Sequence, residues 1–341
     1  MSDSLTTIEP TIDFSAPGAH QGFLKLPHSV HRSALGYIPL PVVSFKNGTG
    51  PTVLLTAGTH GDEYEGQVTL TKLVKEITPD RVNGQIIIVP MTNFPAAKAG
   101  LRTSPIDDLN LNREFPGDPF GTPTRQIAHY VETVLMAMAD HSFDIHSGGS
   151  SMHTVTTILF QGRKTDENQQ AKLNEMVAAI GAPYALELPS GGVKGSRASM
   201  SAAARQKAIG ISAEFGGSGT VTPESLESCE LGVRRYLSYL GVWNPETPPP
   251  AAEPGYTEFL SGTAKNLNVY ADLAGLFEPV AKLGDRVEIG QTAGFLHHPD
   301  TPWQAAEEIK FEAAGVIIAK RIPGLAEPGD GLFQLGAPTA P

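Results

Sequence analysis

The sequence predicts an α/β fold in which helices cover both faces of a mixed sheet, followed by a small all-β unit. Strand-like and helix-like segments alternate from Val42 to about Trp243, and such alternation is typical of a sheet with a helix layer on each side. Beyond the prolines near residue 250 the chain has many short strand pieces broken by Gly and Pro and few helix signals, which indicates an all-β region.

The expected strands are short runs rich in Ile, Val, Leu and Phe, namely Thr52–Ala57, Gln85–Val89, Ser142–Ile145, Thr154–Phe160, Tyr184–Leu188 and Ile209–Phe215. The helices expected between them are Glu65–Ile77, Thr124–Ala139, Glu167–Ile180, Ser199–Lys207 and Pro223–Leu240. In the first of these helices apolar residues recur at the i, i+3, i+4, i+7 spacing from Leu70 to Ile77, which predicts one buried face.

Four segments are expected along the 341 residues. Residues 1–40 should form an extended N-terminal arm, and residues 41–243 the α/β domain. Residues 244–254 are dense in proline and should form a semi-rigid linker. Residues 255–341 should form a β-sandwich-like domain, which resembles the lipoyl/biotinyl-type carriers that present a lysine at a hairpin tip. The loop expected at that tip has no lysine here, so the domain is expected to have a structural role.

Composition excludes several classes of function. The formal net charge is −11 and no run is rich in Lys or Arg, so nucleic acid is not an expected partner. The N-terminus lacks the basic flank and apolar centre of a signal peptide, and no apolar run reaches membrane-spanning length. Cys229 is the only cysteine, so no intrachain disulfide can form. A cytoplasmic protein without membrane or nucleic-acid partners is therefore expected.

Two short segments carry side chains that bind metals. Thr56–Glu63 follows an apolar run of strand character and contains His60 and Glu63, and Phe143–Gly149 contains His146 in a similar position. Ligands in α/β folds gather where strands end at their carboxyl termini. Two imidazoles and one carboxylate are the protein ligands of a common catalytic zinc site, with a fourth position for a water whose pKa the metal lowers.

A simpler interpretation exists for the first segment, because a His and a Glu three residues apart are often just a surface pair. The glycines at 58, 61 and 66 favour a site, since the backbone must bend there and approach other groups closely. A purely structural turn would not need both an imidazole and a carboxylate. Asp62 could orient a metal ligand, but it is expected instead to be an acid at the start of the next helix.

The segment Gly100–Gly117 has the composition of a loop and contains Arg102, Asn112 and Arg113. Arginine binds a carboxylate through two parallel hydrogen bonds, so the loop could hold an anionic substrate. The alternative is that its arginines pair with acidic residues of the same loop at the surface.

A further carboxylate, Glu214, lies at the end of the strand-like run Ile209–Phe215, before a Gly-Gly turn. An acid at the end of a buried strand is unfavourable unless it is paired or functional. A general base or acid beside a metal-activated water fits this position, and a turn or capping role is the alternative.

Together these segments resemble the succinylglutamate desuccinylase/aspartoacylase family, a branch of the zinc carboxypeptidase fold. The resemblance rests on T-H-G-D-E-Y-E-G, on N-L-N-R-E-F-P-G, on D-I-H-S-G-G and on A-E-F-G-G, together with Arg102. It covers residues 40–243 and extends to the C-terminal β unit, which bacterial members also carry. Within the family, the tracts P-T-I-D-F, H-G-D-E-Y-E-G, R-T-S-P-I-D and N-R-E-F-P-G look most like the deacetylases of ectoine degradation, which act on N-acetyl-diaminobutyrate.

The resemblance implies roles for the candidate residues, taken one by one. His60, Glu63 and His146 would hold one Zn²⁺ per chain. Glu214 would take a proton from the attacking water and return it to the leaving amine. Arg102 would stabilise the developing oxyanion.

In the same scheme Asn112 and Arg113 would bind the substrate carboxylate. The implied function is zinc-dependent hydrolysis of the amide bond of a small N-acyl amino acid. A metallocarboxypeptidase acting on peptides and a non-catalytic binding protein are the alternatives. The sequence leaves open whether the chain forms a homo-oligomer.

Overall fold

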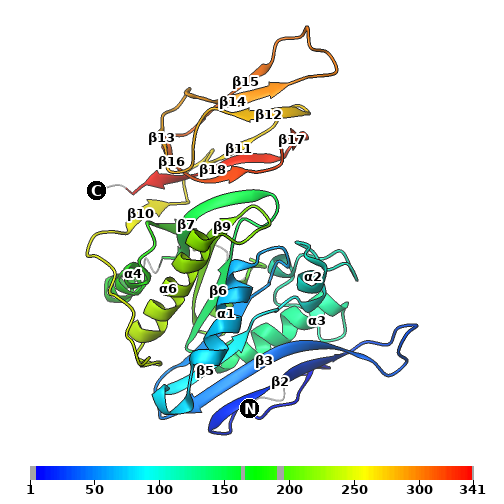
Figure 1. The fold of residues 1–341 in the computed structure, drawn as a ribbon, viewed down its shortest axis with the longest axis vertical. Helices are drawn as coiled ribbons and strands as arrows, with labels where there is room; N and C mark the ends of the chain where they lie inside the picture. Colours follow the sequence, from blue (N-terminus) through cyan, green and yellow to red (C-terminus); the bar gives the residue numbers. More distant parts are fainter. Residues whose placement is uncertain (1–4, 163–165, 190–195, 340–341) are drawn as a thin grey trace.

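The computed structural model describes residues 5–162, 166–189 and 196–339 and is built around one long mixed sheet (Figure 1). Fourteen strands join it, in the order β1-β2-β3-β5-β4-β6-β9-β7-β8-β10-β18-β16-β13, with β11 paired to β18. Their bounds are β1 Glu9–Pro10, β2 Gly18–Pro27, β3 Tyr37–Asn47, β4 Thr52–Ala57, β5 Gly84–Val89, β6 His141–His146, β7 Met152–Gln161, β8 Tyr184–Leu188, β9 Ile209–Gly217, β10 Glu258–Ser261, β11 Asn268–Tyr270, β13 Arg286–Val287, β16 Gly315–Arg321 and β18 Gly331–Pro338.

Strands β5, β4, β6 and β9 run parallel at the centre of this sheet. Their alternation with helices explains the parallel order, because a parallel pair needs a crossover long enough for a helix. The carboxyl ends of β4, β6 and β9 therefore meet at one edge of the sheet, which is where the candidate site lies.

Helices cover both faces of the sheet, as predicted. On one face α1, α4 and α6 pack over a core that contains Leu55 and Phe143, and on the other face α3, η3 and α5 pack over a core that contains Leu54 and Ile87. Adjacent strand residues point to opposite faces, so Leu54 and Leu55 enter different cores. The bounds are α1 Glu65–Glu76, η1 Pro79–Arg81, α2 Phe94–Ala99, η2 Leu111–Arg113, α3 Pro123–Tyr130, η3 Val131–Met136, α4 Glu167–Ile180, α5 Ser199–Arg205 and α6 Pro223–Tyr239.

Most expected elements are confirmed, and three of them (Thr52–Ala57, Tyr184–Leu188 and Glu167–Ile180) have the predicted bounds. The single helix expected over 124–139 is an α-helix that continues as a π-helix in η3. Helix α2 was not expected, because its six residues are too few to show helical periodicity. None of the described helices is long and apolar enough to cross a bilayer.

The N-terminal strands belong to the main sheet. Strands β2 and β3 form a long antiparallel hairpin, and β3 also pairs with β5. The boundary expected between residues 40 and 41 falls inside β3, which continues through it without a break. Ten residue pairs, from Gly18–Lys46 to Pro27–Tyr37, hold the hairpin together.

The C-terminal strands continue the same sheet at the upper end of the molecule in Figure 1. Strand β10 pairs in parallel with β8, and β16 pairs with β7. A second sheet of four strands, in the order β15-β14-β12-β17, packs over a core of its own. Its bounds are β12 Gly275–Pro279, β14 Thr292–His297, β15 Glu307–Lys310 and β17 Leu325–Ala326.

Candidate active site

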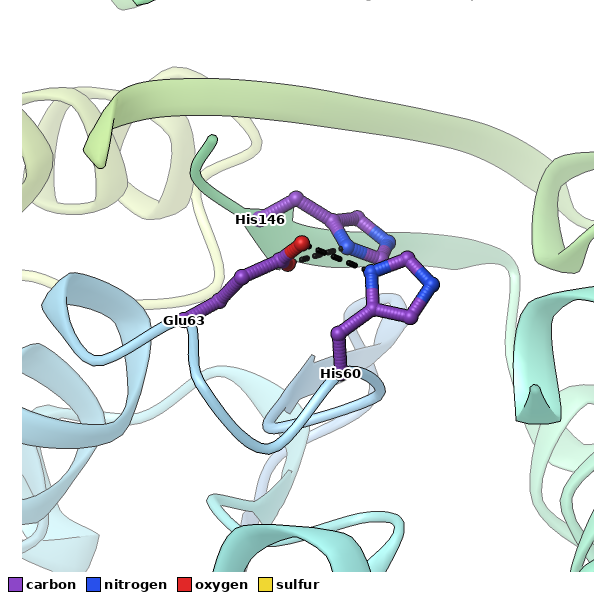
Figure 2. A group of neighbouring side chains, drawn as sticks. All are labelled: His60, Glu63 and His146. Atoms are coloured by element: carbon purple, nitrogen blue, oxygen red, sulfur yellow. Dashed lines mark hydrogen bonds and ion pairs between the residues drawn. The ribbon is translucent and has the colours of Figure 1, made fainter. Parts of the chain in front are cut away.

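Three predicted metal ligands converge at the carboxyl ends of β4 and β6. The Glu63 carboxylate lies between the two imidazoles, with Oε1 2.7 Å from Nδ1 of His60 and Oε2 2.7 Å from Nδ1 of His146 (Figure 2). One donor atom from each side chain lies within 4.8 Å of the other two, and all three residues are buried. The ring centroids of the two histidines are 4.9 Å apart.

The remaining nitrogen of each imidazole faces an oxygen. His146 Nε2 is 2.8 Å from Asp144 Oδ2, and His60 Nε2 is 3.1 Å from Asn110 Oδ1, an oxygen that already accepts the backbone N–H of Asn112. A neutral imidazole carries one N–H. If that N–H is on Nε2, both Nδ1 lone pairs point at the Glu63 carboxylate.

Three electron-pair donors facing one another require a cation or added protons between them. Two imidazoles and a carboxylate, each oriented by a further hydrogen bond, are the ligand set of a zinc site that keeps one position open. The donor set therefore fits zinc.

The charges of the site shift the pKa values of its members in opposite directions. Burial raises the pKa of Glu63, but the adjacent His60 and His146 outweigh it and hold that pKa below its usual range. Burial lowers the pKa of His146, whereas the carboxylates of Asp144 and Glu63 raise it well above its usual value. The pKa of His60 is lowered, chiefly by burial. In the metal-free site, His146, which lies between two carboxylates, is therefore the imidazole that binds the extra proton.

The turn after β4 brings His60 and Glu63 to the end of β6. Gly58 has a φ of +65°, a conformation that L side chains rarely adopt. Gly61 packs against α2 so closely that a Cβ would lie 2.1 Å from the Ala96 carbonyl. Of the three glycines noted in the sequence, Gly58 is therefore required by its positive φ and Gly61 by a close backbone approach.

The role expected for Asp62 was wrong. Helix α1 begins at Glu65, and the Asp62 carboxylate instead accepts the backbone N–H and the hydroxyl of Ser150, at 2.8 and 2.7 Å. It thus ties the turn that carries His60 and Glu63 to the loop that follows His146. The sequence could not show this, because the partner is 88 residues away.

The loop between α2 and α3 brings the two predicted arginines near the metal ligands. Arg102 Nη1 is 3.4 Å from Glu63 Oε1, and its side chain is 45% exposed. Arg113 donates to the Asn112 carbonyl at 2.8 Å, and its pKa is lowered by burial and by the neighbouring Arg102. Neither arginine pairs with Asp107, Asp108 or Glu114.

Asn112 has a structural contact that the sequence did not suggest. Its side-chain oxygen accepts the backbone N–H of Ser199, the first residue of α5, at 2.8 Å. Glu114, one of three acids in this loop, is buried and pairs with Arg125 and Arg197. The loop is therefore held by α3 and α5 on its inner side, while Arg102 and Arg113 stay on its exposed side.

Glu214 lies in β9, directly beside His146 of β6 in the sheet register. Aligned residues of neighbouring strands have side chains on the same face, so Glu214 shares a face with His146. The strand expected over Ile209–Phe215 continues to Gly217, so Glu214 lies three residues before the end of β9. Burial, and then the Glu63 charge, raise the pKa of Glu214 to about 8.

Sequence reasoning assigned no role at the site to Asn110, or to the two threonines that hold Asp144. Thr56 and Thr59 donate their hydroxyls to Asp144 Oδ1, at 2.9 and 2.8 Å. The available signal was positional: Asp144 is two residues before His146, and Asn110 is two residues before Asn112.

Comparison with known proteins places the chain in a group of related hydrolases. Residues 49–240 match the model of the succinylglutamate desuccinylase/aspartoacylase catalytic domain. The N-alpha-acetyl-L-2,4-diaminobutyric acid deacetylase of Halomonas elongata is 40% identical over 325 residues, covering 95% of this chain and 93% of that protein. Murein peptide amidase A of Escherichia coli K12 matches over 89 residues only, at 34% identity, covering 25% of this chain and 34% of that protein.

Solved structures agree over nearly the whole length. The product-bound ectoine utilization protein EutE (DoeB) from Ruegeria pomeroyi has a TM-score of 0.90 at 36% identity, covering 98% of this chain and 99% of that one. A succinylglutamate desuccinylase/aspartoacylase from Rhodobacter sphaeroides has a TM-score of 0.90 at 32% identity, covering 98% and 100%. The shared length includes the C-terminal strands.

Proposed function

Because the chain belongs to the succinylglutamate desuccinylase/aspartoacylase family and is an enzyme, we propose that it hydrolyses the amide bond of a small N-acyl amino acid with one zinc ion per chain. The products are a carboxylic acid and a free amine. N-acetyl-2,4-diaminobutyrate is the first candidate substrate, in view of the relative that is 40% identical over 95% of the chain. The cytoplasm is the proposed compartment.

One observation supports the proposed dependence on zinc. The Nδ1 atoms of His60 and His146 both lie 2.7 Å from the Glu63 carboxylate, while each Nε2 is bonded to another oxygen. Zinc, when bound by these three residues, supplies a Lewis acid and lowers the pKa of an attacking water. Asp144 and Asn110 keep the two rings in the orientation and tautomer that this requires.

Glu214 is the proposed general base and acid. Its place beside His146, on the same face of the sheet, supports this role. As a carboxylate it accepts a proton from the attacking water, and as a carboxylic acid it returns that proton to the amine that leaves. Burial and then the Glu63 charge raise the pKa of Glu214 to about 8 in the metal-free protein, and a cation bound to Glu63 would lower this pKa and so favour the carboxylate form that accepts the proton.

Two arginines have separate proposed roles. Arg102, 3.4 Å from Glu63 Oε1, is close enough to the metal ligands to stabilise an oxyanion that forms there. Arg113 lies on the exposed side of the same loop and would bind the substrate carboxylate through its planar guanidinium. Asn112 can bind that carboxylate only through its amide NH2 group, because its side-chain oxygen is an acceptor, which here accepts the Ser199 N–H.

The test is a release assay for free amine with zinc-loaded protein. The panel contains N-acetyl-2,4-diaminobutyrate, other N-acetyl and N-succinyl amino acids, and short peptides with a free C-terminus. We expect the N-acyl amino acids to be cleaved in preference to the peptides. Preference for peptides would favour the metallocarboxypeptidase alternative, and no cleavage in the whole panel would favour a binding protein.

A substrate pair tests the carboxylate contact. We expect the preferred substrate to lose at least about tenfold in kcat/KM when its carboxylate is converted to an amide, since a charged bidentate pair contributes roughly 1.5–3 kcal/mol. Arg113→Ala should lose a similar factor on the acid and little more on the amide, and Arg113→Lys should recover only part of it. Equal rates for acid and amide with the parent enzyme would contradict the N-acyl amino acid proposal.

A further inference from the structure

Glu65 is a buried carboxylate that the proposed reaction does not use. It lies two residues after Glu63, is the first residue of α1, and is 1% exposed. None of the ion pairs among the described residues includes it. Burying a carboxylate away from water without a paired cation is unfavourable unless hydrogen bonds compensate for the lost hydration.

The bonds of Glu65 reach the strand that carries the proposed base. Its Oε1 accepts the backbone N–H of Gly217 and the hydroxyl of Ser225, both at 3.2 Å. Gly217 is the last residue of β9, three residues after Glu214, and Ser225 belongs to the capping box that begins α6. One oxygen atom thus joins α1, β9 and α6.

The same turn also holds the segment after His146. The Gly216 carbonyl accepts the backbone N–H of Gly148 at 3.2 Å and the Thr154 hydroxyl at 2.9 Å. Gly216 and Gly217 have φ values of +72° and +126°. A Cβ at Gly217 would lie 2.5 Å from the Met152 carbonyl and 2.8 Å from Gly148. The turn therefore fits tightly between Glu65 on one side and the His146 loop on the other.

These contacts connect all three parts of the site. Glu65 lies two residues after Glu63, Gly148 lies two residues after His146, and the Gly216–Gly217 turn begins two residues after Glu214. We infer that Glu65 is a positioning residue, whose Oε1 fixes the Gly216–Gly217 turn and so sets where Glu214 and His146 lie relative to Glu63. The inference rests on the proposed function for its kinetic consequence, but its structural part can be tested without a substrate.

Two variants of similar size separate the hydrogen bonds from packing. Glu65→Met keeps the volume and removes the acceptor, whereas Glu65→Gln keeps a side-chain oxygen for Gly217 and Ser225. We expect Glu65→Met to retain zinc, to lose at least about tenfold in kcat, and to keep KM within about threefold, because small misplacements of reacting groups lower the rate strongly. Glu65→Gln should restore kcat to within about threefold of the parent.

A matched control and a spectroscopic readout complete the test. Glu132→Met removes another buried carboxylate, which pairs with Arg205 on the opposite face of the sheet, so it reports what lower stability alone does to kcat. Cobalt in place of zinc gives a visible spectrum that depends on ligand geometry. That spectrum should shift in Glu65→Met and return in Glu65→Gln.

The outcomes separate the two proposals. A kcat in Glu65→Met within threefold of the Glu132→Met value, or a failure of Glu65→Gln to restore it, would overturn the positioning role. If no substrate in the panel is cleaved, the proposed function fails and the cobalt spectrum decides alone: an unchanged spectrum in Glu65→Met overturns the inference. If Glu65→Met does not fold, Ser225→Ala replaces it, with a loss of about threefold in kcat expected and no loss counting against the role.

Discussion

Two oxygen atoms orient the imidazoles of the candidate metal centre. Asp144 Oδ2 faces His146, and Asn110 Oδ1 faces His60. The two partners differ in charge, so His146 lies between two carboxylates whereas His60 faces one carboxylate and one neutral amide. At the scale of single residues, we expect this difference to make the His146 ring the more basic of the two, because a carboxylate partner raises the basicity of a ligating imidazole.

The first residue-scale prediction concerns metal content. The purified parent should contain close to one zinc per chain, and His146→Ala should lose most of it, since one of three chelating ligands is removed. His297→Ala is the control, because that imidazole is exposed and bonded to Glu278 far from the site. Metal analysis after gel filtration measures both. Full zinc retention in His60→Ala and in His146→Ala would refute the assignment.

The second concerns Glu214 in turnover. Glu214→Gln keeps the shape of the side chain but cannot accept a proton. We expect normal zinc content and a fall in kcat of about 100-fold or more, the usual scale for general acid–base catalysis. Steady-state kinetics with the preferred substrate provide the measurement. Near-normal turnover would place the base elsewhere, with Asp144 as the next candidate.

The third concerns Glu214 and pH in the zinc-free protein. Burial, followed by the charge of Glu63, raises its pKa from 4.5 to about 8. An acid whose pKa is raised on folding is most favourable when protonated, so stability is lost as pH rises from the unfolded value through about 8. The melting temperature of the parent should therefore fall relative to Glu214→Gln between about pH 5 and about pH 9. A constant difference across that range would contradict the shifted pKa.

At the scale of secondary-structure elements, a contact across 17 residues holds the arginine loop. Thr124, the second residue of α3, donates its backbone N–H and its hydroxyl to Asp107, at 2.9 and 2.8 Å. Thr122, at the N-cap position of that helix, makes no side-chain cap hydrogen bond. Asp107 thus caps a helix from within the loop that carries Arg102 and Arg113.

The element-scale prediction follows from this cap. Asp107→Ala should lower the free energy of unfolding by about 1 kcal/mol, the usual effect of losing an N-cap, and should raise KM more than it lowers kcat. Burial raises the pKa of Asp107, but hydrogen bonds, first of all those from Thr124, outweigh burial and bring the pKa below its usual value. The contribution of Asp107 to stability is therefore present above the pKa of the unfolded chain and is lost as pH falls through the lower pKa of the folded protein. Urea unfolding at neutral and acid pH measures this, with exposed Asp272→Ala as control. An unchanged KM would show that the loop holds its place without Asp107.

At the scale of the whole molecule, the C-terminal strands extend the sheet of the α/β part. A small apolar cluster lies at the junction and contains Leu186 of β8, Leu260 of β10, Val316 and Ile318. The chain pairings β8–β10 and β7–β16 cross the same junction. The α/β part and the C-terminal strands should therefore unfold cooperatively.

The whole-molecule prediction uses a mutation on one side and a reporter on the other. Leu260 is fully buried, so Leu260→Ala should cost about 2–5 kcal/mol. In a Trp303→Phe background, fluorescence reports only the buried Trp243 of the α/β part. We expect the Trp243 transition in urea to move with Leu260→Ala and to coincide with the transition in circular dichroism. Leu325→Ala, at an exposed position, should leave it unchanged, and an unmoved Trp243 transition in Leu260→Ala would indicate independent unfolding.

The local elements and the metal ligands could be predicted from the sequence because both depend on short-range patterns. The strand before His60 and the helix after it have their own periodicity, and a His three residues from a Glu is a signal within one turn. The βα alternation also predicted that candidate ligands gather at the carboxyl ends of strands, whereas the strand order that places β6 with His146 beside β4 came from the structure. Family likeness added the roles expected for Arg102, Arg113 and Glu214.

Only the tertiary structure decided which distant groups hold those ligands in place. Asp62 bonds Ser150, Glu65 bonds Gly217, and Asn110 bonds His60, across 88, 152 and 50 residues. A side-chain hydrogen bond between distant segments depends on atomic positions that are set by packing, and no local pattern encodes it. The same is true of the C-terminal strands, because an all-β region could be predicted there but the pairing of β10 with β8 and of β16 with β7 depends on how the chain returns to the sheet edge.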